Sequence, residues 1–233
     1  MDIAANLSKV QERIERAALA AGRKAQEIKL LAVSKTMPAA VIEDAFRAGH
    51  CTFAENRVQE WLEKAPLLPE KCEWHLIGRL QTNKVKYLDQ RIKLIHSLDR
   101  FALLQKLEEQ GAKQDLIWPT LIQVNVARDP AKAGLLSEEV EDFLTALADH
   151  PHVRVYGLMT IGALEASAEE TRGFFRELRL LRDRLKVRSW PGVEMRELSM
   201  GMSQDFELAI GEGSTMVRVG RDIFGERTSL SDR

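Results

Sequence analysis

Cysteine is scarce in this sequence, and long apolar runs are missing. Its two cysteines, Cys51 and Cys72, have no spacing typical of a metal site, and two thiols cannot form a disulfide scaffold for 233 residues. The sequence contains no run of about 18 apolar residues, the length that would predict a membrane span. The N-terminus, Met-Asp-Ile-Ala-Ala-Asn, lacks the basic stretch and apolar core of a targeting peptide. We therefore expect a cytoplasmic protein with reduced thiols.

An excess of charge of either sign is also missing. The chain has 34 Lys and Arg residues against 35 Asp and Glu residues, a formal net charge of −1 at pH 7. This balance predicts no general attraction to nucleic acid or to a membrane surface. The 45% of hydrophobic residues can bury one substantial core. Because α/β barrels of this length form one domain, we expect residues 1–233 to be a single domain.

Apolar runs alternate with helical patterns along the chain. From Ile3 to Ala18, apolar residues recur at spacings of three and four, which predicts an amphipathic helix. Eight short runs follow, and each precedes a helical pattern. The runs are Lys29–Ser34, Thr52–Glu55, Glu73–Ile77, Ile92–His96, Pro119–Val126, Val153–Met159, Glu194–Ser199 and Thr215–Val219. The helices between them include ones expected at 83–88, 99–110 and 137–149, and one beginning near residue 203.

Strict alternation of this kind is typical of an α/β fold, and apolar strands suit a parallel sheet covered by helices. Eight units in this length favour a closed (β/α)8 TIM barrel with an extra N-terminal helix. A doubly wound sheet is the alternative, but no G-x-G-x-x-G motif follows the first run.

Polar residues follow nearly every predicted strand. In a barrel the loops after the C-terminal strand ends share one rim, where binding and catalysis take place. The residues expected there are Ser34, Lys35, Glu55, Asn56, Arg57, Gly78, Arg79, Gln81, Lys84, His96, Asn125, Thr160, Ser199, Gly201, Arg218, Gly220 and Arg221. His75 is expected to be a hydrogen-bonded barrel residue, since no second ligand at metal spacing accompanies it. For His96, support of the rim and contact with a ligand both stay open.

Lys35 comes one residue after the first apolar run. A free lysine has a pKa of about 10.4, and burial or a nearby cation such as Arg218 lowers it toward the range in which the amine attacks an aldehyde. The alternative is that Lys35 ends a strand and extends its ammonium group to water.

The last two loops combine glycines with hydroxyl groups. Gly213-Ser214-Thr215 precedes the eighth run, Gly220 follows it, and Ser199 and Gly201 lie at the end of the seventh. Glycine permits close backbone approach, and barrels often bind phosphate with these two loops. The pattern therefore indicates a phosphate site. Met200 is expected to pack, in the core or against a flat ligand.

Seven segments in order resemble the pyridoxal phosphate homeostasis protein family, short-chain relatives of alanine racemase. The segments are Leu31–Thr36, Ala54–Glu60, Trp74–Lys84, His96–Asp99, Leu198–Ser203, Gly213–Gly220 and Ile223–Gly225. The resemblance implies a barrel like the N-terminal domain of alanine racemase and pyridoxal 5′-phosphate (PLP) as cofactor. Two departures stand out: Ala54 replaces a common glycine, and Arg221 replaces a small residue that is often threonine.

The resemblance also implies the roles of the site residues. Lys35 would carry PLP as a Schiff base, with Asn56 beside the cofactor. Ser199, Gly220 and neighbouring backbone N–H groups, those of Met200 and Gly201 included, would hold the phosphate. Arg218 would lie near the pyridine ring or the phosphate. At Arg221 a cationic contact would replace the hydroxyl contact of a threonine.

Three hypotheses follow. The first is a non-catalytic protein that carries or buffers PLP, serves PLP-dependent apoenzymes and contributes to intracellular PLP homeostasis. The second is a small amino-acid racemase. Racemases of this barrel type have a C-terminal β domain and a tyrosine base from the partner subunit, whereas this chain has only Tyr87 and Tyr156, so His96 or Lys84 would have to serve. The third is a barrel that binds another phosphate. A second PLP site around Lys84, Lys86 or Lys132 and the choice between monomer and weak dimer stay open.

Overall fold

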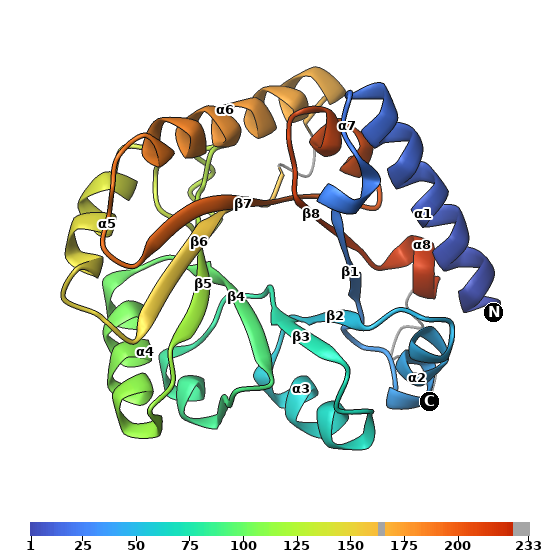
Figure 1. Ribbon diagram of the computed structural model, residues 1–233, viewed down its shortest axis with the longest axis horizontal. Helices are drawn as coiled ribbons and strands as arrows, with labels where there is room; N and C mark the ends of the chain where they lie inside the picture. Colours follow the sequence, from blue (N-terminus) through green and yellow to red (C-terminus); the bar gives the residue numbers. More distant parts are fainter. Residues whose placement is uncertain (163–165, 226–233) are drawn as a thin grey trace.

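Eight parallel strands close into a barrel in the computed structural model, which describes residues 1–162 and 166–225. The strands are β1 (Lys29–Val33), β2 (Thr52–Glu55), β3 (Glu73–Leu76), β4 (Ile92–Leu98), β5 (Trp118–Gln123), β6 (Val153–Met159), β7 (Val193–Met202) and β8 (Met216–Val219). Each strand pairs with the next in the chain, and β8 returns to β1, so the strands form the ring seen in Figure 1. The predicted closed barrel is confirmed, and the doubly wound alternative is wrong.

Helices surround this ring (Figure 1). They are α1 (Ile3–Ala20), α2 (Ala39–Arg47), α3 (Val58–Lys64), α4 (Phe101–Gln114), α5 (Val140–Leu147), α6 (Ala168–Lys186), α7 (Phe206–Gly211) and α8 (Arg221–Phe224), with 3-10 turns η1 (Ala25–Glu27), η2 (Ala65–Leu67) and η3 (Thr82–Tyr87). The helix expected at 83–88 is thus a 3-10 helix, and α5 and α7 begin three residues later than expected. None of the helices in the described ranges is long and apolar enough to cross a membrane.

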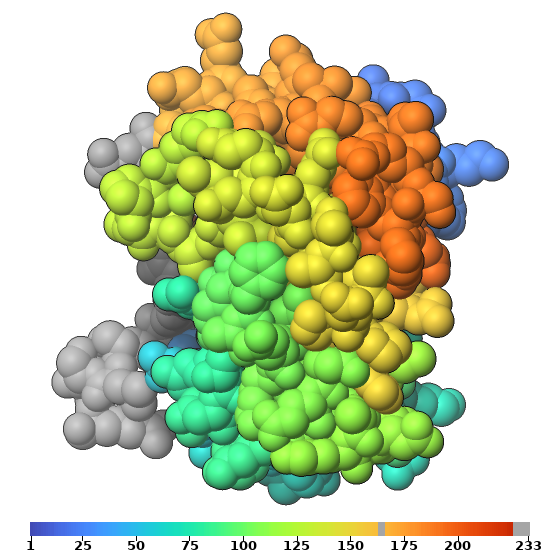
Figure 2. All heavy atoms as spheres, turned by 90° about the vertical axis from the view of Figure 1, so that its left-hand side faces the viewer, coloured from blue at the N-terminus to red at the C-terminus, as the bar shows by residue number. Residues whose placement is uncertain are grey.

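The core has two layers, because side chains of a strand alternate between its two faces. Leu30 and Ala32 of β1 belong to the outer layer, which packs against the helices. Leu31 and Val33 belong to the inner layer, which fills the barrel. Lys35 continues this inner series two residues beyond Val33. Figure 2 shows the side of α4 to α6, where their side chains form a continuous surface over the barrel.

The N-terminal helix α1 holds the last two helices of the barrel. Its apolar stripe is buried, as the periodicity predicts, and comprises Ile3, Leu7, Val10, Ile14 and Ala18. Arg13 on the same helix donates to Glu207 of α7 (2.7 Å) and to Asp222 of α8 (2.5 Å), and its guanidinium lies over the Phe206 ring. Because α7 and α8 follow β7 and β8, this clamp fixes the two loops in which the sequence predicts a phosphate site.

Candidate functional site

Lys35 lies at the C-terminal end of β1 and is half-buried. The next residue, Thr36, has a left-handed backbone (φ 66°), which is uncommon for a residue with a side chain. Its N–H donates to Glu60 of α3 (2.7 Å), and this bond holds the turn. The backbone after β1 is therefore fixed where the lysine leaves the strand.

Ser199 and Arg218 form a buried pair inside the barrel, one on β7 and the other on β8. The Arg218 guanidinium donates to the Ser199 hydroxyl (2.7 Å) and to the Thr160 carbonyl after β6 (2.8 Å). Burial lowers the pKa of Arg218 to about 10, while Asp205 acts in the opposite direction, so the side chain stays charged at neutral pH. No carboxylate of the described residues forms an ion pair with this guanidinium, and a buried cation without such a partner is costly, which makes this pair a candidate anion site.

Two histidines extend this pair across the barrel. His96 Nδ1 lies 2.9 Å from the Ser199 hydroxyl, and His96 Nε2 lies 2.9 Å from His75 Nδ1. His75 Nε2 is buried and has no hydrogen-bond partner among the described residues. Burial lowers the pKa of His75 to about 3 and that of His96 in the same direction, with the charge of Arg218 contributing to the latter. Both imidazoles are therefore neutral at pH 7.

A neutral pair has two hydrogen-bond directions. When the Ser199 hydroxyl donates to His96 Nδ1, the proton of His96 is on Nε2 and is donated to His75 Nδ1. With the proton of His96 on Nδ1, the imidazole donates to Ser199, and the hydroxyl proton becomes available to a ligand. The chain can thus offer Ser199 either as an acceptor or as a donor. The prediction that His75 is a hydrogen-bonded barrel residue is confirmed, and His96 supports Ser199.

Near the end of β7 the backbone packs closely against α7. Gly201 has a left-handed backbone (φ +93°), and a Cβ on it would lie 2.8 Å from the Phe206 Cα. The Met200 side chain is fully buried in the outer core layer, so this residue can contact a ligand only through its backbone. Ser214 joins the two strands, since its hydroxyl bonds the carbonyls of Met200 and Met216.

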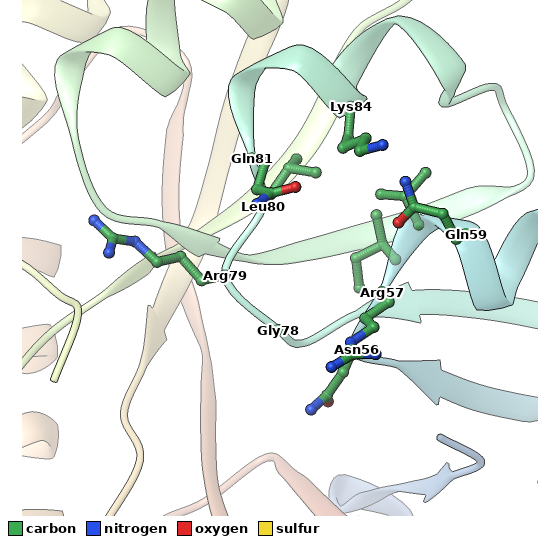
Figure 3. A pocket seen from close by; sticks show the side chains of 10 residues that line it. Asn56, Arg57, Gln59, Gly78, Arg79, Leu80, Gln81 and Lys84 are labelled. Carbon is green, nitrogen blue, oxygen red and sulfur yellow. The ribbon is translucent and has the colours of Figure 1, made fainter. Parts of the chain in front are cut away.

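The other predicted site residues lie around the rim. Gly220 caps α8, with its Cα facing the Val33 carbonyl of β1, and Arg221 is the exposed first residue of that helix. Asn56 follows β2 and borders a cavity between the β2 and β3 loops, shown in Figure 3. In the described part of the chain, no group of three His, Cys, Asp or Glu side chains could hold a metal ion.

The expectation that Ser34 and Glu55 face the rim is wrong. Both are fully buried on the outer face of the strands, where Lys64 of α3 donates to the Glu55 carboxylate (2.9 Å) and Ser34 bonds the same oxygen (2.7 Å). Burial raises the pKa of Glu55, and the charge of Lys64 opposes that rise. Side-chain alternation places Lys35 and Asn56 inward and their neighbours outward.

Sequence reasoning missed two partners of the buried arginine. The Thr160 carbonyl is a backbone group and leaves no pattern. Asp205 accepts from the Met202 N–H (2.5 Å), and burial raises its pKa, an effect that the charge of Arg218 opposes. An acidic residue directly before a short helix is typical of an N-cap, so the sequence did not indicate that Asp205 lies near Arg218.

Comparison with known proteins agrees with the barrel fold and identifies the family. Residues 2–228 match the family model for the alanine racemase N-terminal domain. The pyridoxal phosphate homeostasis protein of Aquifex aeolicus is 45% identical over 97% of this chain and 99% of its own length, and that of Escherichia coli is 39% identical over 97% of each. The solved structure of PipY of Synechococcus elongatus with PLP bound is 34% identical, with a TM-score of 0.82 over 96% of this chain and 100% of PipY.

These similarities cover nearly the whole chain. The predicted resemblance to the pyridoxal phosphate homeostasis proteins is confirmed. The chain belongs to the pyridoxal phosphate homeostasis proteins, within the alanine racemase N-terminal domain family.

Proposed function

We propose that this protein binds PLP as a Schiff base on Lys35 and carries or buffers it, without dedicated catalysis. The observation that carries the proposal is the buried Ser199–Arg218 pair inside the same barrel end at which Lys35 leaves β1. The likeness to PipY, whose solved structure has PLP bound, supports it. When bound, the cofactor supplies an aldehyde that reacts with an amine and a phosphate that needs hydrogen-bond donors.

The residues present fit these two groups. Lys35 provides the amine. The Ser199 hydroxyl and the backbone N–H groups near Gly201 and Gly220 provide neutral donors for a phosphate, and Met200 and Arg221 contribute backbone N–H groups beside them. Gly201 has no room for a side chain, because β7 packs closely against α7 at this point. Asn56 stands on the opposite side of Lys35, beside the cofactor.

The second base that a racemase needs is not evident among the described residues. Tyr87 is exposed on η3, and Tyr156 of β6 is partly buried against the inner core layer, with the Arg196 guanidinium 4.4 Å from its ring centroid. Both nitrogens of His96 are engaged by Ser199 and His75. A racemase transfers protons at both faces of one carbon, and a carrier needs neither transfer. The family name, which refers to homeostasis, supports the carrier.

We further propose that residues 1–233 act as one barrel domain in the cytoplasm, with PLP-dependent apoenzymes as recipients. The barrel closure from β1 to β8 supports a single unit. Free thiols at Cys51 and Cys72 agree with a reducing compartment.

The test is an absorbance titration of the purified protein with PLP, followed by borohydride reduction and peptide mapping. We expect a visible band that reduction fixes on Lys35 and that Lys35→Ala abolishes. Lys9→Ala, which removes an exposed lysine of α1, is the matched control and should keep the band.

Incubation of the loaded protein with L-alanine and chiral analysis then separate the two readings. No D-alanine above the free-PLP control supports the carrier, and turnover that depends on Lys35 overturns it. A wild type without a PLP-dependent band overturns the cofactor assignment itself and leaves a barrel that binds another phosphate.

A further inference from the structure

A cavity of about 700 Å³ opens between the loops that follow β2 and β3 (Figure 3). Its lining residues are Asn56, Arg57, Val58, Gln59, Leu76, Gly78, Arg79, Leu80, Gln81 and Lys84. Three of these residues are cationic, three have side-chain amides and none is acidic. The cavity lies on the β2–β3 side of Lys35, whereas Ser199 and Arg218 lie on β7 and β8.

The walls of this cavity are fixed by backbone contacts. A Cβ on Gly78 would lie 2.3 Å from the Asn56 carbonyl oxygen, so the two loops touch main chain to main chain. The Ile77 N–H donates to the Glu55 carbonyl (2.9 Å), and the Leu80 N–H donates to the Ser97 hydroxyl (3.3 Å). The opening is therefore part of the folded barrel.

The acidic groups at its border are already paired with cations, Asp99 with Arg79 of the lining and Glu60 with Lys64. Asp99 accepts from Arg79 (3.0 Å) and also from Arg100. Glu60 accepts from Lys64 (3.1 Å) and from the backbone of Thr36.

The other two cations of the cavity are Arg57 and Lys84. In the described part of the chain, no carboxylate lies within ion-pair distance of Arg57 or Lys84. Lys84 is half-buried near the Tyr87 ring, and Figure 3 shows its amine directed toward Gln59 across the opening. Arg79 extends away from that pair in the same view. Positive charge and a side-chain amide thus converge on one space.

We propose that this cavity is a second ligand site, which binds a small metabolite through its phosphate group. Its volume lies within the range of small-molecule pockets, about 300–1,000 Å³. Arginine binds a phosphate through two parallel hydrogen bonds, and lysine binds it as a point charge. A phosphate monoester carries a charge of about −1.5 to −2 at pH 7. Two cations therefore balance the charge of a phosphate better than the single charge of a carboxylate.

The site is separate from the proposed PLP phosphate site and does not depend on it. Asn56 borders this cavity and, in the proposed function, the cofactor, so a ligand here would lie next to bound PLP. Occupancy of the cavity could thereby be sensed at the barrel mouth through one shared side chain.

The test uses the full chain without PLP, and inorganic phosphate as the probe. Acetylation of lysines is followed by mass spectrometry with and without phosphate. We expect Lys84 to react about tenfold more slowly at ten times the Kd, because the reactive fraction falls as 1/(1 + [L]/Kd). Lys86, two residues along the same 3-10 helix and exposed, is the matched control and should keep its rate. Equal protection of both lysines would indicate screening only and overturn the site.

Calorimetric titration of variants completes the test. Lys84→Gln and Arg57→Gln should each weaken phosphate binding about tenfold or more, since each removes a charge-assisted hydrogen bond. Lys86→Gln should bind like the wild type. Loss of binding in Ser199→Ala, with Lys84→Gln unaffected, would place the phosphate at β7–β8 and overturn the proposal. Succinate binding as tight as phosphate would overturn the phosphate specificity.

Discussion

Replacing His75 by glutamine removes a titrating group from the barrel interior and keeps a side chain that can hydrogen-bond His96. In the folded protein the pKa of His75 is lowered from 6.5 to about 3 by burial. The unfolded chain binds a proton on this side chain near pH 6.5, and the folded protein does not. Titration of His75 therefore does not lower the free energy of unfolding above about pH 7. Below that pH the unfolded chain takes up a proton that the folded protein does not, so the free energy of unfolding decreases as the pH falls toward 3.

The magnitude follows from the two pKa values. Between pH 7.5 and pH 5 the unfolded His75 becomes almost fully protonated, which costs the folded state about 2 kcal/mol. The pKa of His96 is lowered too, so its effect adds to the same trend. The raised pKa of Glu55 acts in the opposite direction, and because it is common to both proteins, it cancels when they are compared.

Urea unfolding at pH 7.5 and at pH 5 measures this effect. The difference between wild type and His75→Gln at pH 7.5, where His75 is neutral in the folded state and mostly neutral in the unfolded state, gives the packing cost of the substitution. From pH 7.5 to pH 5 the variant should lose about 2 kcal/mol less than the wild type. An equal loss in both proteins would show that His75 titrates normally and would refute the neutral, buried histidine pair.

Three further substitutions test local packing through the free energy of unfolding. Lys64→Met leaves Glu55 buried without its cation and should lower the free energy of unfolding by about 3–5 kcal/mol. The control Lys106→Met, on the surface of α4, should lower it by about 1 kcal/mol or less. Equal losses in urea unfolding would refute the buried pair. Gly201→Ala should cost about 2–4 kcal/mol from strain and contact with α7, and a wild-type unfolding midpoint would contradict that geometry. Gly173→Ala, with open space in α6, should raise stability by about 0.5–1 kcal/mol in the same assay, and a loss would show an unrecognised contact.

The fold could be predicted because strand and helix periods are local properties. Eight apolar runs separated by helical patterns leave few architectures other than a closed barrel, and the structure has strands at all eight runs. Helix starts were less certain: the segment after β3 closes as 3-10 turns, and α7 begins at Phe206 and not near Ser203. Such boundaries depend on tertiary packing that a periodic pattern does not encode.

The site was predictable where function depends on strand ends and unpredictable where it depends on side-chain direction. A shift of one residue along a strand turns a side chain to the other face, so Lys35 and Asn56 face inward while Ser34 and Glu55 are buried behind them. The contact between His75 and His96 needs the register of β3 against β4, including its irregularity at Trp74 and His75. No spacing in the sequence carries that information.

The charge state of Arg218 bears directly on the choice between carrier and enzyme. A pKa of about 10 keeps the guanidinium protonated at neutral pH, and two of its donors are bound to Ser199 and Thr160. In the proposed complex it lies near the pyridine ring or the phosphate. If it faces the ring nitrogen, it can donate a hydrogen bond but cannot receive a proton from it or transfer its own, so the nitrogen stays unprotonated. An unprotonated ring would withdraw electrons weakly, which would disfavour carbanion chemistry, whereas the proposed Schiff-base exchange at Lys35 requires no carbanion. The same buried arginine that helps to hold the cofactor would then restrain its reactivity, as a carrier requires.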